Sequence, residues 1–400
     1  MSALLLYDDA RARAFEPFAL TRPASALRIG ALLSRDRWAR AHGAPADGAI
    51  VAPHVEELEE AGAPPPAREL AAGDIVANVR CAIAPDAALR DADVWMCDGR
   101  VAAIRLERGT RPGMLADGRV PLEELAADGG RVATVAGRWV DEVWQLVTDL
   151  LAQLRDDIGA LGPSLQCETP SHATVLGDQA VFAERGARIE PHVVLDVTAG
   201  PILIQRDATV RAFTRIVGPC AVASGAIILG DRVHGCSIGE GSIVRGEISE
   251  TVMLGHANKS HDGFVGHSYL GRWVNLGAGT ITSNLKNTYG TVALWTPEGL
   301  RDTGVQKLGT FFGDHVKTGI GLRITTGTVL GAGSNVYGSD MPPKYVPPFS
   351  WGEGDSLGTY RFDKFLSVAR RAMSRRQVTL GERGCRQLTR AFERAAQEMG

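Results

Sequence analysis

The chain has 400 residues, which is too long for one ordinary core and predicts two or three domains. Its 43 Lys and Arg residues nearly balance 46 Asp and Glu residues, and the net charge of −3 argues against a nucleic-acid partner, which would favour a basic excess. Hydrophobic residues make up 44% of the chain, yet no apolar run approaches the roughly 20 residues of a membrane span, so we expect a folded, soluble protein with no membrane partner.

Residues 1–138 are predicted to form a small α/β domain. A helical pattern over 26–41 alternates with short apolar runs that resemble strands, at 4–7, 49–51, 74–76, 94–96 and 101–106. Asp98-Gly99 between two of these runs predicts a hairpin. The first apolar run is too short for a signal peptide, and the six cysteines contain no C-x-x-C pair, so we expect reduced thiols and a cytoplasmic location.

An amphipathic helix is predicted within residues 139–163. Apolar residues there recur three or four positions apart, from Val140 to Leu154, and Gly162-Pro163 ends the pattern. We expect this helix to connect the first domain to the next.

From residue 174 to residue 340 the dominant period is six residues. Two series show it most clearly: Phe264, Leu270, Leu276 and Thr282, and Phe312, Thr318, Ile324, Leu330 and Val336, with shorter traces at Leu176 and Phe182 and at Ile204 and Val210. A hexapeptide period predicts a β-helix of triangular section, in which the recurring residue points inward and a glycine fits the following corner. These corners account for much of the total of 47 glycines, and three hexads per turn predict roughly eight coils.

Two segments interrupt or follow the repeat. The period breaks over residues 287–309, which predicts a long loop for function or assembly. Residues 341–400 contain a Pro-rich link and two helical patterns, which we expect to cap the open end of the solenoid.

Motifs within the repeat resemble a known enzyme family. The stretch HDGFVGHSYLGRWVNLGAGTITSN at 261–284 is similar, without gaps, to the acetyltransferase half of the bifunctional enzymes that make UDP-N-acetylglucosamine. A divergent branch of that family, the sugar nucleotidyltransferases, resembles the chain more closely, at FEPFALTRP (15–23), NKSHDGFVG (258–266), SNLKNTY (283–289) and GDHVK (313–317). The resemblance implies a nucleotidyltransferase-like, Rossmann-like α/β domain, a left-handed parallel β-helix, and a homotrimer with its sites between subunits.

The resemblance also assigns roles to residues of the repeat. His261 matches the family's catalytic base. Asp262 beside it is a candidate either to orient the imidazole or to form an Asp-Gly turn. Phe264 replaces a tyrosine of the family, which leaves the identity of the acceptor open. The residues expected to bind the sugar are Lys259, Asn275, Asn284 and Lys286, and those expected to bind acetyl-CoA are Ala278, Gly279, Thr318 and Gly319.

The first domain departs from the family pattern. Asp8-Asp9-Ala10-Arg11 stands where the family has a glycine-rich phosphate loop, and Ala24 replaces its phosphate-binding lysine. Arg13, Arg22 and Arg28 are the cations that remain to bind a substrate phosphate. An active domain would need Mg²⁺, which Asp98 can ligate, although its hairpin position favours a turn. An altered nucleotidyltransferase and a domain retained only for packing both stay open.

Three functions therefore stay open. The leading one is acetyl transfer from acetyl-CoA to an amino-sugar phosphate or a nucleotide-linked amino sugar, with nucleotidyl transfer by the first domain as a second activity. A non-catalytic trimer that binds sugar nucleotides is the alternative. A zinc enzyme like the gamma-class carbonic anhydrases would need His256, His261, His267 and His234, but the spacing of a third ligand fits poorly and we assign no metal site.

Overall fold

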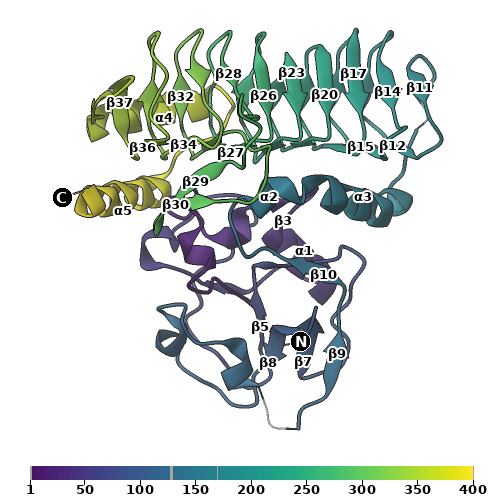
Figure 1. The fold of residues 1–400 in the computed structure, drawn as a ribbon. Helices are drawn as coiled ribbons and strands as arrows, with labels where there is room; N and C mark the ends of the chain where they lie inside the picture. The colour runs from purple at the N-terminus through teal and green to yellow at the C-terminus, as the bar shows by residue number, and fades with distance from the viewer. Residues whose placement is uncertain (1, 127–128, 169, 400) are drawn as a thin grey trace. The chain divides into compact units, whose positions relative to one another are not determined.

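The computed structural model describes residues 2–126, 129–168 and 170–399, and these form two compact units. Unit 1 joins the residues up to Val143 with the segment that begins at Gly381. Unit 2 spans Trp144–Leu380 and contains the solenoid (Figure 1). No helix in the described part of the chain is long and apolar enough to cross a membrane.

Unit 1 is built on a six-stranded mixed sheet, which confirms its α/β class. Strand β1 pairs in parallel with β4 and β5, whereas β8 runs antiparallel to β5 and β7, and β9 is parallel to β7. The Asp98-Gly99 turn joins β7 to β8, and both residues adopt positive φ angles of 49° and 72°. In sheet order the strands are β4 (Gly48–Ile50), β1 (Leu4–Tyr7), β5 (Ile75–Asn78), β8 (Arg100–Arg105), β7 (Val94–Cys97) and β9 (Val132–Thr134).

Smaller elements surround this sheet. Helix α1 (Ser34–His42) is shorter than the helical pattern over 26–41, because β2 (Arg28–Ile29) and β3 (Leu32–Leu33) form a hairpin around Gly30, whose φ is 60°. Strand β6 (Cys81–Ile83) pairs antiparallel with β10 (Gly137–Trp139). Five short 3₁₀ helices complete the unit: η1 (Ala12–Ala14), η2 (Ala24–Ala26), η3 (Pro53–Val55), η4 (Pro112–Leu115) and η5 (Leu122–Leu125).

The second C-terminal helix, α5 (Glu382–Met399), belongs to unit 1 and not to the solenoid. Gln387 donates a hydrogen bond from Nε2 to the carbonyl oxygen of Thr21 at 2.5 Å. Arg390 pairs with both Glu56 and Glu57 near η3. The expectation that both tail helices cap the solenoid is therefore wrong for α5, because its Arg390 forms ion pairs with Glu56 and Glu57 of unit 1.

Unit 2 opens with the helical segment expected before the repeat. The segment forms two helices, α2 (Gln145–Thr148) and α3 (Leu150–Leu161), followed by η6 (Gly162–Ser164). The apolar stripe of α3 is buried, with Leu154 and Ile158 fully inaccessible to solvent. The helix ends where Gly162-Pro163 predicts.

Three parallel walls form the solenoid, and each turn of the chain contributes one strand to each wall. Wall 1 contains β11 (Thr174–Leu176), β14 (Val194–Asp196), β17 (Thr214–Val217), β20 (Asp231–His234), β23 (Glu247–Ser249) and β26 (Phe264–Gly266), and is continued by β28 (Ile281–Thr282) and β33 (Arg323–Ile324). Wall 2 contains β12 (Val181–Ala183), β15 (Ile202–Ile204), β18 (Cys220–Val222), β21 (Ser237–Ile238), β24 (Val252–Met253), β27 (Tyr269–Leu270), β31 (Phe311–Phe312), β34 (Val329–Leu330) and β36 (Tyr345–Val346).

The strands of wall 3 form two groups, one ending at β25 (Asn258–Lys259) and one beginning at β32 (Lys317–Thr318). Asn275 lies between them and pairs with both Asn258 and Lys317. The strands of wall 3 are β13 (Arg188–Ile189), β16 (Thr209–Val210), β19 (Ile227–Ile228), β22 (Ile243–Val244), β25, β32, β35 (Asn335–Val336), β37 (Ser350–Glu353) and the antiparallel β38 (Ser356–Thr359). Wall 2 has nine strands in the described part of the chain, and β36 lies beyond residue 340, so the solenoid has more turns than the roughly eight coils predicted.

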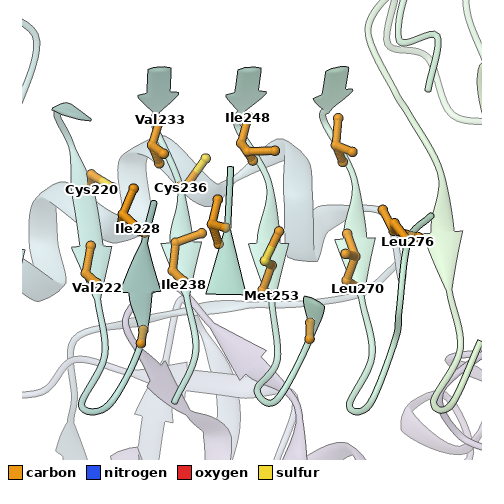
Figure 2. Close-up of a cluster of buried hydrophobic side chains, with 14 of the residues drawn as sticks. Cys220, Val222, Ile228, Val233, Cys236, Ile238, Ile248, Met253, Leu270 and Leu276 are labelled. Carbon is orange, nitrogen blue, oxygen red and sulfur yellow. The ribbon is translucent and has the colours of Figure 1, made fainter. Parts of the chain in front are cut away.

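One column of apolar side chains fills the solenoid (Figure 2). The recurring residues from Phe312 to Val336 are all buried, as the six-residue period predicts. The period is wrong at Phe264, because β26 turns Val265 inward and leaves Phe264 on the surface. It is also wrong at the first coil, where Leu176 is 40% exposed.

Glycines at the corners permit the close stacking of successive coils. A Cβ atom placed on Gly277 would lie 2.4 Å from the carbonyl oxygen of Gly319 in the next coil. At Gly313 it would lie 2.5 Å from the backbone nitrogen of Ala332. Side chains cannot approach backbone atoms this closely, so these two corners require glycine for space.

The break in the period at 287–309 is an excursion that carries its own hairpin. Strands β29 (Ala293–Thr296) and β30 (Gly299–Asp302) are antiparallel. The Trp295 ring stacks on Tyr345 with centroids 3.6 Å apart, and Arg301 lies over the ring of Trp144. At the end of the repeat, α4 (Phe362–Ser374) packs Phe365 against Phe349 and so covers the last coils.

The contact between α5 and η3 predicts a dependence of stability on pH. His54 donates from Nε2 to the carbonyl oxygen of Ala19, and the guanidinium of Arg394 lies 3.0 Å from its Nδ1. Burial, aided by the positive charge of Arg394, lowers the pKa of His54 from 6.5 to about 4. The unfolded chain therefore binds a proton before the folded chain does, and stability falls as pH drops from 6.5 to about 4.

Urea denaturation of the wild type and a His54→Gln variant at about pH 7 and about pH 4.5 measures this effect. The loss of unfolding free energy on acidification should be smaller in His54→Gln than in the wild type. An exposed histidine on the first coil, His172, provides a matched control, and His172→Gln should follow the wild type. Equal losses in all three proteins would contradict the assignment.

Candidate functional site

His261 lies at the surface of the solenoid, in the turn that joins wall 3 to wall 1. The turn follows β25 and precedes β26, and both His261 and Asp262 are exposed. An exposed imidazole at a corner can contact a molecule bound at the surface. The position therefore suits the role of base that the sequence assigns to it.

Turns of neighbouring coils stack on this corner and form one column, here called the His261 corner. The amide of Gly279 donates to the carbonyl oxygen of Asp262 at 3.0 Å, so the Ala278-Gly279 turn lies directly against the His261 turn. In the next coil, the amide of Gly321 donates to the carbonyl oxygen of Ala278 at 2.7 Å. The column therefore brings two of the residues expected to bind the cofactor, Ala278 and Gly279, next to the expected base.

The carboxylate of Asp262 pairs with Arg245. Its Oδ1 lies 3.5 Å from Nε of Arg245, on the preceding turn of the same corner. The side chain is exposed, and this ion pair joins two turns of the column. The geometry thus gives Asp262 a neighbour other than the imidazole that it was expected to orient.

Lys259 is buried beneath the His261 turn and does not face solvent. Its Nζ donates to the carbonyl oxygens of Arg245, His261 and Asp262, the last at 3.0 Å. Burial lowers the pKa of Lys259 to about 8, although the carboxylates of Asp262 and Asp231 oppose this shift. These contacts make Lys259 a residue that shapes the turn, in place of the sugar ligand expected from the sequence.

The outer face of wall 3 carries a polar ladder next to the His261 corner. Asn258 donates from Nδ2 to Oδ1 of Asn275 at 2.9 Å, and Asn275 is exposed. Lys317, the next residue on the ladder, has a buried Nζ with no hydrogen-bond partner among the described residues, and burial lowers its pKa to about 8. The sequence singled out Asn275 but missed Lys317, although it lies in the quoted GDHVK stretch.

A surface hollow of about 510 Å³ lies further along the His261 corner. It is lined by Gly319, Ile320, Gly321, Arg323, Tyr337, Gly338 and Ser339. The Ile320 side chain is 79% exposed, and the glycines leave the backbone accessible. Gly319 therefore lies where a ligand can contact it, but Thr318 does not, because its hydroxyl is inside the solenoid and bonds to Thr280 at 2.9 Å.

Wall 1 begins at the His261 corner and ends at a second corner that holds Asn284. Phe264 extends across the face, and a Cβ added to Gly266 would meet both its ring and the Asn284 amide, which places these two side chains close together. Asn284 Nδ2 donates to Nδ1 of His267 at 2.9 Å, and His267 Nε2 lies 3.4 Å from Glu250. Asn284 is therefore held on the same face as Phe264, at the far end from His261.

Lys286 lies at the base of the excursion over 287–309. Its Nζ donates to the carbonyl oxygen of Thr291 within that segment, and the side chain is half-buried. A backbone hydrogen bond from Gly304 is the main cause of the lowered pKa of Asp302. A hydrogen bond from Thr291 and the positive charge of Lys286 lower it further. Lys286 therefore links the repeat to the excursion instead of projecting freely beside Asn284.

The histidines considered for zinc lie on different corners. His256 is at the turn between walls 2 and 3 and stacks on Trp273 with ring centroids 4.2 Å apart. His261 is at the turn between walls 3 and 1, and His267 at the turn between walls 1 and 2. Since each corner points outward in its own direction, one chain does not bring these three together, and the residues described contain no cluster of three or more metal-ligating side chains.

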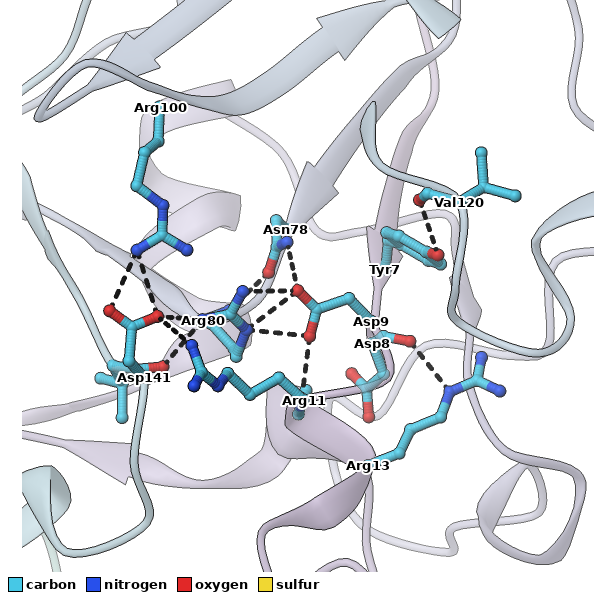
Figure 3. A network of polar contacts seen from close by, with 12 residues as sticks. Tyr7, Asp8, Asp9, Arg11, Arg13, Asn78, Arg80, Arg100, Val120 and Asp141 are labelled. Atoms are coloured by element: carbon cyan, nitrogen blue, oxygen red, sulfur yellow. Dashed lines mark hydrogen bonds and ion pairs between the residues drawn. The ribbon is translucent and has the colours of Figure 1, made fainter. Parts of the chain in front are cut away.

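Unit 1 has a cavity of about 350 Å³ at the carboxyl ends of β1 and β5, beside the network of polar contacts drawn in Figure 3. Asp9 and Asn78 stand at those strand ends, and Arg80 pairs with Asp9 at 2.7 Å and with Asp141 at 2.6 Å. Arg100 lies over the Trp139 ring at 3.8 Å. The lining includes Asp9, Asn78, Arg80, Arg100 and Trp139, together with Tyr7, Arg11, Gly118 and Arg119.

The three arginines expected to bind phosphate are largely occupied by the protein. Arg22 is 3% exposed and forms a bidentate pair with Glu60, with distances of 2.8 and 3.2 Å. Arg28 is buried and donates to the carbonyl oxygen of Ala31. Arg13 donates to the carbonyl oxygens of Asp8 and Ala116 beside the cavity. Sequence reasoning thus chose arginines near the motif and missed Arg80, in the turn between β5 and β6, and Arg100, at the start of β8.

Comparisons with known proteins confirm the resemblance. Residues 4–163 match the family described as sugar nucleotidyl transferase. The chain is 30% identical over 172 residues to a bifunctional sugar-1-phosphate nucleotidylyltransferase/acetyltransferase of Sulfurisphaera tokodaii, covering 40% of each chain. It is 27% identical over 190 residues to the bifunctional protein GlmU of Desulfitobacterium hafniense, covering 41% of this chain and 38% of the relative.

The matched part thus spans about 40% of the length of these curated relatives. Among solved structures, the polySia-specific acetyltransferase NeuO matches 52% of this chain and 98% of its own, with a TM-score of 0.33 and 14% identity.

The hydrogen bonds of Lys259 predict that its replacement lowers the stability of the protein. Lys259→Met preserves the approximate volume but removes the Nζ donor from three backbone carbonyl oxygens, of which that of Asp262 keeps the amide of Gly279. We expect the unfolding free energy to fall by about 2–3 kcal/mol, measured by urea denaturation. Lys364→Met on the exposed face of α4 is the control and should change it by less than about 0.5 kcal/mol. A Lys259→Met protein as stable as the control would show that these hydrogen bonds contribute little.

Proposed function

We propose that unit 2 transfers an acetyl group from acetyl-CoA to the amine of an amino-sugar phosphate or a nucleotide-linked amino sugar. One observation carries the proposal: the exposed His261 stands on the same column of turns as the glycine-lined hollow at Gly319. A base and a groove for an extended cofactor on one corner are what this reaction needs. The curated relatives, which include an acetyltransferase by name, support the same class.

The reaction assigns a proton transfer to His261. The sugar amine attacks the thioester carbonyl carbon, the new C–N bond forms and the C–S bond breaks. Neutral His261 accepts the proton that leaves the nitrogen, and the departing coenzyme A thiolate is protonated in turn. An exposed imidazole held on a stacked turn can perform this step without a change of fold.

Substrate contacts follow from the faces on either side of His261. In this proposal the sugar ligands are Asn275, which is exposed on wall 3, and Asn284, which is half-buried at the corner that ends wall 1. The Phe264 ring between His261 and Asn284 offers an apolar surface to a sugar ring. Lys259 and Asp262 shape the turn, and Lys286 anchors the excursion, so we assign none of these three to the acceptor.

The acetyl-CoA contacts lie along the His261 corner. Backbone atoms of Ala278 and Gly279 are nearest to the base, and Gly319 and the Ile320-Gly321 turn continue the path. His261 is exposed in the single chain. We therefore propose a homotrimer in which a neighbouring copy supplies the other side of the site, and a cytoplasmic location, where acetyl-CoA and the free thiols of the chain are compatible.

Replacement of His261 tests the acetyl transfer. Thiol release from acetyl-CoA with glucosamine 1-phosphate as acceptor should fall by about 10²–10⁴-fold in kcat/KM for His261→Ala. His192 is an exposed histidine at the same kind of corner, between β13 and β14, and His192→Ala is the matched control with unchanged activity. Tight binding of amino sugars with no turnover would instead favour a non-catalytic binding trimer.

Nucleotidyl transfer by unit 1 is the second candidate activity, supported by the family match over residues 4–163 and by the cavity at the carboxyl ends of β1 and β5. It would require Mg²⁺, and the structure sets Asp98 in a hairpin turn, where its φ of 49° fits the turn role. Pyrophosphate release from UTP or dTTP with glucosamine 1-phosphate and Mg²⁺ measures this activity. Release with either nucleotide supports the candidate, and silence with both would overturn it.

A further inference from the structure

The side chain of Asp9 occupies a site made of hydrogen-bond donors. Asp9 lies two residues after the last residue of β1, Tyr7. Its Oδ1 accepts a hydrogen bond from the backbone amide of Ala12 at 2.9 Å. Its Oδ2 accepts from Nδ2 of Asn78 at 2.9 Å. Nε and Nη2 of Arg80 complete the set, at 2.8 and 2.7 Å (Figure 3). We call these donors the Asp9 cradle.

The cradle has the chemistry of an oxyanion site. A backbone amide, a side-chain amide and a guanidinium fork are the donors that proteins use to hold phosphate oxygens. All of them converge on one carboxylate, which is mostly buried. Burial alone would raise the pKa of Asp9, but the contacts with Arg80 outweigh it and hold that pKa below its ordinary value.

The charges around the cradle balance only while Asp9 is present. Three guanidiniums, from Arg11, Arg80 and Arg100, share the carboxylate of Asp141, with distances of 3.5, 2.6 and 3.0 Å. Glu142 lies 3.5 Å from Arg11, and Asp9 supplies the remaining negative charge through Arg80. Without Asp9 the cluster has one more positive charge than negative charges.

The cradle also opens on a space large enough for a ligand. Asp9, Asn78 and Arg80 line the cavity of about 350 Å³ at the carboxyl ends of the neighbouring parallel strands β1 and β5. In open α/β sheets this edge is where ligands bind. The carboxylate therefore fills the donor-rich end of an existing cavity.

We propose that the Asp9 cradle is a phosphate-class oxyanion site whose resident anion is the protein's own Asp9. It follows that a ligand bound in the wild-type cavity does not place a phosphate against Arg80. It also follows that removing the Asp9 carboxylate creates affinity for phosphate or pyrophosphate. The proposal is independent of the acetyl transfer assigned to unit 2. Any nucleotide bound by wild-type unit 1 would have to place its phosphates on cations other than Arg80.

Calorimetric titration of the full-length protein with pyrophosphate, in the absence of divalent metal, tests the proposal. Asp9→Ala should bind pyrophosphate at least about tenfold more tightly than the wild type, because it gains charge-assisted hydrogen bonds to the vacated cradle. Asp117→Ala is the matched control: Asp117 is an exposed aspartate whose Oδ1 accepts from the amide of Arg119, a residue that lines the same cavity. The control removes one negative charge but leaves the cradle filled.

A second variant keeps the test decisive if Asp9→Ala is unstable. Asp9→Asn retains one carbonyl oxygen for the cradle but removes the charge, and should show a smaller gain than Asp9→Ala. Gains in the Asp9 variants and none in Asp117→Ala support the proposal. Wild-type affinity equal to that of the Asp9 variants, or an equal gain in Asp117→Ala, would overturn it.

Discussion

Backbone stacking between successive coils is the constraint on which the rest of unit 2 depends. Each coil donates its amides to the carbonyl oxygens of the next, and at corners such as Gly277 the backbones approach too closely for any side chain. This stacking aligns turns that are distant in sequence, so the His261 turn, the Ala278-Gly279 turn and the Gly319 hollow fall on one column. The candidate site is thus a property of the register of the coils, and Lys259 supports it from inside by holding the carbonyl oxygens of the His261 turn.

The same repetition explains how much of the solenoid could be predicted from the sequence. A six-residue period reports which side chains point inward, and it succeeded from Phe312 to Val336 because those coils are regular. It failed at Phe264, where strand alternation turns the neighbouring Val265 inward. Motif matching located His261 and Asn275 at the surface, but a motif does not reveal burial, so Lys259 and Thr318 were assigned ligands although both are inaccessible.

Unit 1 was harder to interpret because its polar cluster is assembled from distant segments. Asp9, Arg80, Arg100 and Asp141 come from four places in the chain, and no local spacing connects them. The sequence therefore drew attention to arginines near the motif, Arg22 and Arg28, which the structure uses for internal contacts. The sequence shows that the glycine-rich phosphate loop is replaced. It does not show that the Asp9 carboxylate pairs with Arg80, because the fold brings these two distant residues together.

The membership of α5 in unit 1 has a consequence for the order in which the protein can fold. Unit 1 is discontinuous in the chain, and the whole of unit 2 is inserted between its two segments. During synthesis the sheet of unit 1 emerges first, but the partners of Thr21, Glu56 and Glu57 are made only after the last coil. Unit 1 is thus the first to be synthesised and the last to be completed. Its surface at η3 lacks the contacts with α5 until the solenoid has been translated.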